Sequence, residues 1–207
     1  MTAETLTEVA EALNRRYRRR HGGDLPPLLM LTDEKRLPDP LAALGGLPEG
    51  SAVILRHYGL TAGERRALAA ELRAATRKRG ILLLIAGDEG LARETEADGV
   101  HLPERAVRPD GRMAGRFRLV TAAAHSAAAL ERAARAGADA ALLSPVFPTA
   151  SHPGAASIGV ERAAAWAARA PLPVYALGGV SHETARRLLP HPFAGIAGVG
   201  IFAAQMP

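Results

Sequence analysis

Cysteine is absent from the 207-residue chain, and aromatic side chains make up only 4% of it. Without cysteine there are no disulfide bonds, no thiolate metal sites and no cysteine nucleophile. Because aromatic residues are scarce, the core has to be built mainly from Ala, Leu, Val and Ile, within a hydrophobic content of 48%. A chain of this length is long enough for one well-buried core. We therefore expect a single domain over residues 1–207.

Long apolar runs are also missing. No stretch approaches the roughly 20 apolar residues of a membrane span, and residues 1–4 lack the basic-then-apolar pattern of a signal peptide. The sequence therefore predicts a soluble, cytoplasmic protein without a membrane partner.

The chain is basic, with a net charge of +5 and a sequence pI of about 10.4. These values also occur in nucleic-acid-binding proteins. Here, however, 26 basic residues stand against 21 acidic ones, and aromatic residues are not interleaved with the basic ones as in single-strand binders. We expect no nucleic-acid partner, and a phosphorylated small molecule fits a basic protein equally well.

Short apolar runs alternate with helical patterns along the whole chain, which is typical of a closed parallel (β/α)8 TIM barrel in the α/β class. Strands are expected at 28–31, 53–55, 81–86, 99–102, 118–122, 140–143, 174–177 and 196–199. Helices are expected at 4–20, 41–44, 61–78, 91–96, 126–135 and 160–169, with a further helix that Ser181 opens and that contains Thr184 and Leu188. Thr61 and Glu64 form a capping-box pattern, and Trp166 is expected to anchor the core.

The N-terminal segment 1–27 is predicted to be a helix and a linker, ahead of the barrel at 28–207. Leu6, Leu13 and Tyr17 recur at helical spacing. Because few residues follow the eighth strand, we expect a shortened C-terminal helix and an N-terminal helix that covers the gap. Several arginines crowd the end of this helix; compensation of the helix dipole is favoured over a polyanion-binding patch.

One stretch combines a buried strand with a polar loop. Residues 140–143 form an apolar run without polar alternation, as in a strand buried on both faces. The run then breaks at Pro145 and Pro148 into small polar residues. Such a junction is where α/β folds place their chemistry, although a rigid proline turn without a ligand remains an alternative.

Five short phrases, in order, resemble the thiamine phosphate synthase/TenI superfamily over about residues 28–202. The clearest, Ser144-Pro145-Val146-Phe147-Pro148-Thr149, resembles its GPVFPT segment. The other four are Leu31-Thr32-Asp33, Asp98-Gly99-Val100-His101-Leu102, Ala124-His125-Ser126 and Ala176-Leu177-Gly178-Gly179-Val180. The resemblance implies a barrel that acts in thiamine biosynthesis on phosphorylated substrates.

The loops after the seventh and eighth strands contain Gly178-Gly179 and Gly198-Val199-Gly200. Glycine lets the backbone approach a ligand, and free amides attract phosphate. These loops are the usual phosphate site of the fold, although glycines of tight turns remain an alternative. The resemblance implies a phosphate or pyrophosphate here, so we favour a phosphate site over glycines that serve only tight turns. Thr149 and Ser151 of the sixth loop are further candidates for this site.

Three residues are candidate catalytic groups: His125, Arg56 and His152. A histidine transfers protons near neutral pH, and TenI-type tautomerases use a histidine in the phrase that matches His125; a structural histidine is the alternative. Arg56, His57 and Tyr58 stand where synthases carry Arg-Glu-Lys and are candidates to bind phosphate. Arg56 matches the arginine, whereas Tyr58 replaces a lysine that contacts pyrophosphate in the family. Arg56, His57 and His152 are expected to compensate in part for the positive charge that is lost.

The resemblance also implies magnesium, with weakened ligands. Asp88 matches a metal-binding aspartate, but Ala106 stands where a second one is expected, and Glu104 is a substitute. Ser151-His152 replaces Thr-Lys, so a phosphate-binding lysine is lost.

Three functions follow from the resemblance. The first is a divergent, synthase-like transferase that joins hydroxymethylpyrimidine pyrophosphate to thiazole phosphate. The second is a TenI-like thiazole tautomerase, an isomerase that needs no metal. The third is a barrel that binds a phosphorylated ligand without turnover. A homo-oligomer is compatible with all three.

Overall fold

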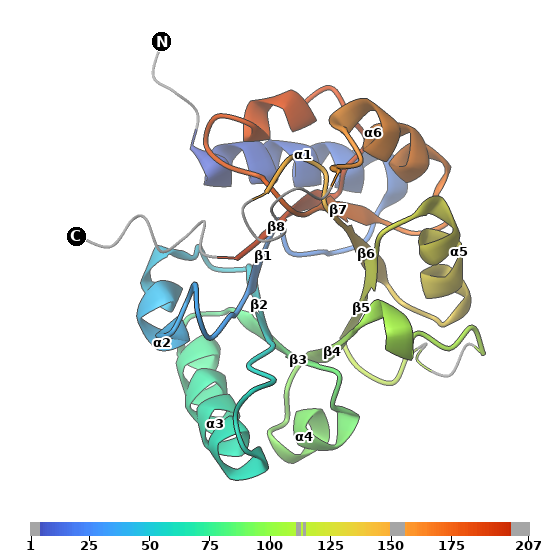
Figure 1. Cartoon of the computed structure of the whole chain (residues 1–207). Coiled ribbons are helices and arrows are strands. Elements are labelled where there is room, and N and C mark those ends of the chain that lie inside the picture. Colours follow the sequence, from blue (N-terminus) through green and yellow to red (C-terminus); the bar gives the residue numbers. More distant parts are fainter. Residues whose placement is uncertain (1–4, 111–112, 114, 150–155, 200–207) are drawn as a thin grey trace.

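The computed structural model describes residues 5–110, 113, 115–149 and 156–199. Eight parallel strands follow one another in sequence order and close into a barrel, which confirms the predicted (β/α)8 fold (Figure 1). The strands are β1 Leu28–Leu31, β2 Ala52–Leu55, β3 Leu82–Ala86, β4 Gly99–Leu102, β5 Leu119–Ala124, β6 Ala140–Leu143, β7 Val174–Ala176 and β8 Gly195–Gly198.

Helices surround this ring: α1 Leu6–His21, α2 Pro40–Ala43, α3 Ala62–Lys78, α4 Glu89–Glu94, α5 Ala127–Arg135 and α6 Val160–Arg169. Short 3-10 turns lie at η1 Leu44–Gly46, η2 Glu104–Ala106 and η3 Ala185–Leu188. Both halves of the expected capping box are present at the start of α3, where the Thr61 hydroxyl accepts from the Glu64 amide and the Glu64 carboxylate accepts from the Thr61 amide.

The prediction of a helix after β7 is wrong, because the structure has only the 3-10 turn η3 there. The hydroxyl of Ser181 accepts from the amides of Glu183 and Thr184, and the Thr184 hydroxyl donates to the Gly179 carbonyl oxygen at 2.9 Å. These side-chain bonds hold a compact turn, and Pro190 follows too soon for a longer helix.

The strands divide the core into two layers. Inside the barrel lie small and medium side chains around Tyr175, whose hydroxyl donates to the Pro26 carbonyl oxygen at 2.6 Å. Outside the barrel, alternate strand residues pack against the helices. Trp166 of α6 is only partly buried at the edge of this outer layer, so it anchors the core less than expected.

The N-terminal helix α1 packs across β8, β1 and η3, as expected (Figure 1). Leu6 and Leu13 are buried and Tyr17 is half-buried. Arg16 donates to the carbonyl oxygens of Leu189 and His191, which ties α1 to the end of η3. The predicted shortened C-terminal helix falls in residues 200–207, outside the described part. Within that part, no helix is long and apolar enough to cross a membrane.

Candidate phosphate site at the barrel mouth

A cavity of about 190 Å³ lies at the carboxyl ends of β1, β2, β6, β7 and β8. It brings together five of the predicted site residues: Arg56, Thr149, Gly178, Gly179 and Val199. Its other lining residues are Arg36, Ser144, Leu177, Val180, Ala197 and Gly198. The predicted Ser151, His152 and Gly200 lie outside the described residues.

The turn after β7 forms one wall of this cavity. Gly178 and Gly179 have φ angles of 87° and 67°, in the region that favours glycine. A Cβ atom on Gly179 would lie 2.3 Å from the Pro148 carbonyl oxygen, so close packing on the loop after β6 also requires glycine here. No described hydrogen bond uses the amide N–H groups of Gly178, Gly179 and Val180. Three successive unused donors at a cavity wall are suited to bind an anion.

Arg56 lines the same cavity and is fixed by two groups of the loop after β1. Its Nε donates to the Thr32 carbonyl oxygen at 2.9 Å and its Nη2 to Asp33 Oδ2 at 2.8 Å. Burial would raise the pKa of Asp33, but hydrogen bonds and positive charge from Arg36 outweigh it and lower this pKa to about 2. The carboxylate therefore stays charged and holds Arg56 at the cavity.

His57 does not supply the positive charge expected of it. The side chain is buried, and its Nδ1 lies 2.8 Å from the Thr32 hydroxyl oxygen. Burial lowers the pKa of His57, which keeps the imidazole neutral near pH 7. Its neighbour Tyr58 is 52% exposed and lies beneath the guanidinium of Arg65, 5.5 Å from the ring centre. Both residues line a separate hollow that Arg56 shares.

His125 lies at the end of β5, away from the cavity. Its Nδ1 is 2.6 Å from Glu104 Oε2, and its backbone amide donates to the same oxygen. Arg132 donates to the other oxygen of Glu104 at 2.6 Å. The ring is 59% exposed. A carboxylate on Nδ1 leaves Nε2 for a ligand, which is an arrangement suited to proton transfer.

The carboxylates proposed for magnesium do not meet. Asp88 accepts from the Leu91 amide at 2.9 Å as the N-cap of α4, and it pairs with Arg65 at 3.5 Å. Glu104 is occupied by His125 and Arg132. Among residues 5–110, 113, 115–149 and 156–199, no three metal-binding side chains are grouped to hold an ion. The residues that the structure describes therefore do not fit the magnesium site that the resemblance implies.

One residue of the cavity, Arg36, was not predicted from the sequence. Arg36 lines the cavity beside Arg56, and the signal was its position three residues after Asp33, where the carboxylate accepts from the Arg36 amide. His101 is buried in β4 with its Nδ1 2.9 Å from the Thr121 hydroxyl oxygen. Burial lowers the pKa of His101 to about 3, which makes it a neutral structural group.

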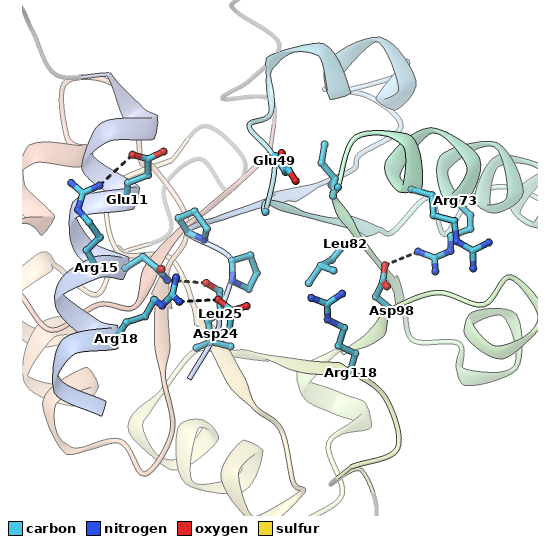
Figure 2. Close-up of a pocket in the computed structure, with 17 residues that line it drawn as sticks. Glu11, Arg15, Arg18, Asp24, Leu25, Glu49, Arg73, Leu82, Asp98 and Arg118 are labelled. Atoms are coloured by element: carbon cyan, nitrogen blue, oxygen red, sulfur yellow. Dashed lines mark hydrogen bonds and ion pairs between the residues drawn. The ribbon is translucent and has the colours of Figure 1, made fainter. Parts of the chain in front are cut away.

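A larger hollow of about 670 Å³ lies at the opposite end of the barrel, lined by residues that precede β1 to β5 (Figure 2). Four of its arginines are paired with carboxylates: Arg15 with Glu11, Arg18 with Asp24, Arg73 with Asp98, and Arg77 with Glu96. Its lining therefore combines arginines with carboxylates, whereas the described lining of the cavity at the mouth contains arginines and no carboxylate.

Comparison with known proteins agrees with this geometry. The sequence profile of a family described as thiamine monophosphate synthase matches residues 34–202. A protein of Aquifex aeolicus with the provisional name thiamine-phosphate synthase 2 is 38% identical over 86% of this chain and 98% of its own. The thiamine-phosphate synthase of Chlorobium luteolum is 33% identical over 83% and 82%.

Among solved structures, thiamine phosphate pyrophosphorylase from Pyrococcus furiosus superposes with a TM-score of 0.73. It is 24% identical and covers 86% of this chain and 90% of its own, a likeness that concerns the fold. The sequence relatives support a role in thiamine biosynthesis, and the chain belongs to the thiamine monophosphate synthase family.

Proposed function

We propose that the chain is a thiamine phosphate synthase-like transferase that joins hydroxymethylpyrimidine pyrophosphate to thiazole phosphate. In this reaction the thiazole nitrogen attacks the methylene carbon of the pyrimidine. A C–N bond forms, the bond from carbon to the pyrophosphate oxygen breaks, and pyrophosphate leaves with the electron pair. The protein has to hold two phosphorylated groups and to stabilise the charge on the leaving group.

One observation carries the proposal: the unused amides of Gly178, Gly179 and Val180 lie on the same cavity as Arg56. Backbone donors in a row suit a terminal phosphate such as that of thiazole phosphate. Arg56 offers a guanidinium, which matches phosphate oxygens and is charged at all working pH values. Its anchor on Asp33 keeps it in place before the substrate arrives.

A second function is favoured by a different observation, the pair His125–Glu104. With Nδ1 held by the carboxylate at 2.6 Å, His125 is oriented to move a proton on a thiazole phosphate. This would be a TenI-like tautomerase reaction, in which one C–H proton is removed and another position of the same ligand is protonated. It requires no pyrophosphate and no metal.

Incubation of the purified chain with both substrates distinguishes the functions. For the synthase we expect formation of thiamine phosphate and pyrophosphate, which chromatography detects. Conversion of the thiazole phosphate isomer alone, followed by NMR, indicates the tautomerase. Binding of thiazole phosphate without either product indicates a barrel that holds a ligand without turnover and overturns both catalytic proposals.

A further inference from the structure

One carboxylate at the mouth of the barrel holds two guanidinium groups. Asp33 Oδ2 accepts from Arg56 Nη2 at 2.8 Å and from Arg36 Nη2 at 3.1 Å. Its Oδ1 accepts from the backbone amides of Lys35 and Arg36, both at 3.1 Å. Since one negative charge balances only one arginine, the three side chains carry a net charge of +1.

This excess charge is only partly hydrated. The side chain of Arg56 is 25% exposed and that of Asp33 23% exposed. A cation withdrawn from water is stabilised by a nearby anion. Both arginines line the same cavity as the amides of Gly178 to Val180, and its described lining contains no carboxylate. Within the described lining, the cavity therefore combines two guanidinium groups with three backbone amides that no described hydrogen bond uses.

The turn that carries Arg36 has a backbone held against the core and a partly exposed side chain at its tip. Leu37 is buried in the core, and its amide donates to the Asp33 carbonyl oxygen at 2.8 Å. The side chain of Arg36 remains 42% exposed. From this backbone position the long side chain of Arg36 reaches the cavity that Arg56 also lines.

We infer that Arg36 binds the phosphate or diphosphate group of the ligand together with Arg56, and that the two arginines supply the required positive charge without a divalent cation. The inference rests on the proposed function for the identity of the ligand. Its second part follows from the donor set, because Asp88 and Glu104 are each already bound to an arginine and a second group. Positive charge for the anion therefore comes from Arg36 and Arg56, side chains of the cavity itself.

Calorimetric titration of the full chain with inorganic pyrophosphate tests the inference, in EDTA and in Mg²⁺. Wild-type protein is expected to bind in EDTA, with less than about a threefold change on adding Mg²⁺. Arg36→Gln is expected to weaken binding about 10- to 100-fold, as for loss of one charge-assisted contact. Arg36→Lys keeps the positive charge but loses the two-pronged guanidinium. Its affinity for pyrophosphate is expected to lie between those of the wild type and Arg36→Gln. Arg19→Gln removes the same charge from exposed α1 and should bind as the wild type does.

Titration with thiazole phosphate separates this inference from the proposed function. If Arg36→Gln binds both pyrophosphate and thiazole phosphate as tightly as the wild type does, the role of Arg36 is overturned. If the wild type does not bind pyrophosphate in EDTA, the claim that no divalent cation is needed is overturned. Both results leave the proposed function standing. Failure of the wild type to bind thiazole phosphate overturns the proposed function, whereas pyrophosphate binding that depends on Arg36 supports the inference even if no coupling occurs.

Discussion

The two halves of the barrel mouth match their charges differently. On the side of β7, β8, β1 and β2, Arg36 and Arg56 share one carboxylate and face three unused backbone amides. On the side of β3, β4 and β5, Asp88 and Glu104 are each bound to an arginine and to a second donor. One half thus has donors in excess, and the other is balanced within the protein.

The difference separates two tasks that a phosphorylated ligand imposes. The three backbone amides that no described hydrogen bond uses, on a cavity that two guanidinium groups also line, are suited to bind an anion. A balanced half can orient His125 for proton transfer, since Glu104 fixes one ring nitrogen and leaves the other available. We therefore expect changes in the first half to alter binding, and changes in the second half to alter turnover or stability.

The largest effect is expected for Gly179→Ala. The new Cβ atom would meet the Pro148 carbonyl oxygen, and alanine is disfavoured at a φ of 67°. We expect a loss of about 3 kcal/mol in the free energy of unfolding and a loss of phosphate binding of at least about 100-fold, through displaced amides. Urea unfolding and calorimetry measure the two.

Gly63→Ala is the matched control for this change. Gly63 lies in α3 with open space around its Cβ position. Stability there should stay constant or rise slightly, because alanine favours helix more than glycine does. If Gly179→Ala behaves like this control, the turn after β7 is not the anion-binding wall.

Glu104→Gln is expected to act on turnover and not on binding. Loss of the carboxylate charge weakens the orientation of His125, so the tautomerase activity proposed as the second function should fall about 10- to 100-fold. Glu131→Gln on exposed α5 is the control. Unchanged turnover in Glu104→Gln would show that Glu104 is only a structural partner of Arg132.

The sequence predicted the elements well because their signals are local. The strands β4 and β6 and the helix α6 have the expected bounds, since apolar periodicity and caps are read within a few residues. The gathering of the β7 and β8 glycines with Arg56 was also predictable, because strand ends converge in a closed barrel.

Side-chain partners were harder to predict, since they come from distant segments. His57 replaces a glutamate of the family's phrase and was expected to add positive charge, yet Thr32, 25 residues earlier, holds it in a buried pair. Asp88 matched a metal ligand, yet it caps α4 and meets Arg65 from α3. Residue type and order in the chain do not determine which of several polar neighbours a side chain bonds to once the loops have folded.

Asp33 provides a smaller and pH-dependent effect. Its pKa of about 2 in the folded chain lies below the ordinary value of 3.8, so the carboxylate stabilises the fold above about pH 4 and this contribution is lost as the pH falls toward 2. We expect Asp33→Asn to be less stable by about 1–2 kcal/mol at pH 6. In urea unfolding, the difference from the wild type should shrink between pH 4 and 2; a constant difference would mean that the arginine pairing is not its source.

The smallest effect is expected on the balanced half, at Asp88. As the N-cap of α4 it contributes about 1 kcal/mol, which Asp88→Ala should remove and Asp88→Asn should retain, because an asparagine oxygen also accepts from the Leu91 amide. Since both variants lose the carboxylate, a metal role would impair both equally in Mg²⁺-dependent pyrophosphate binding. We expect unchanged binding in both and lower stability in the alanine variant alone. Equal loss of binding in the two variants would restore Asp88 as a metal ligand and would end the distinction between the two halves.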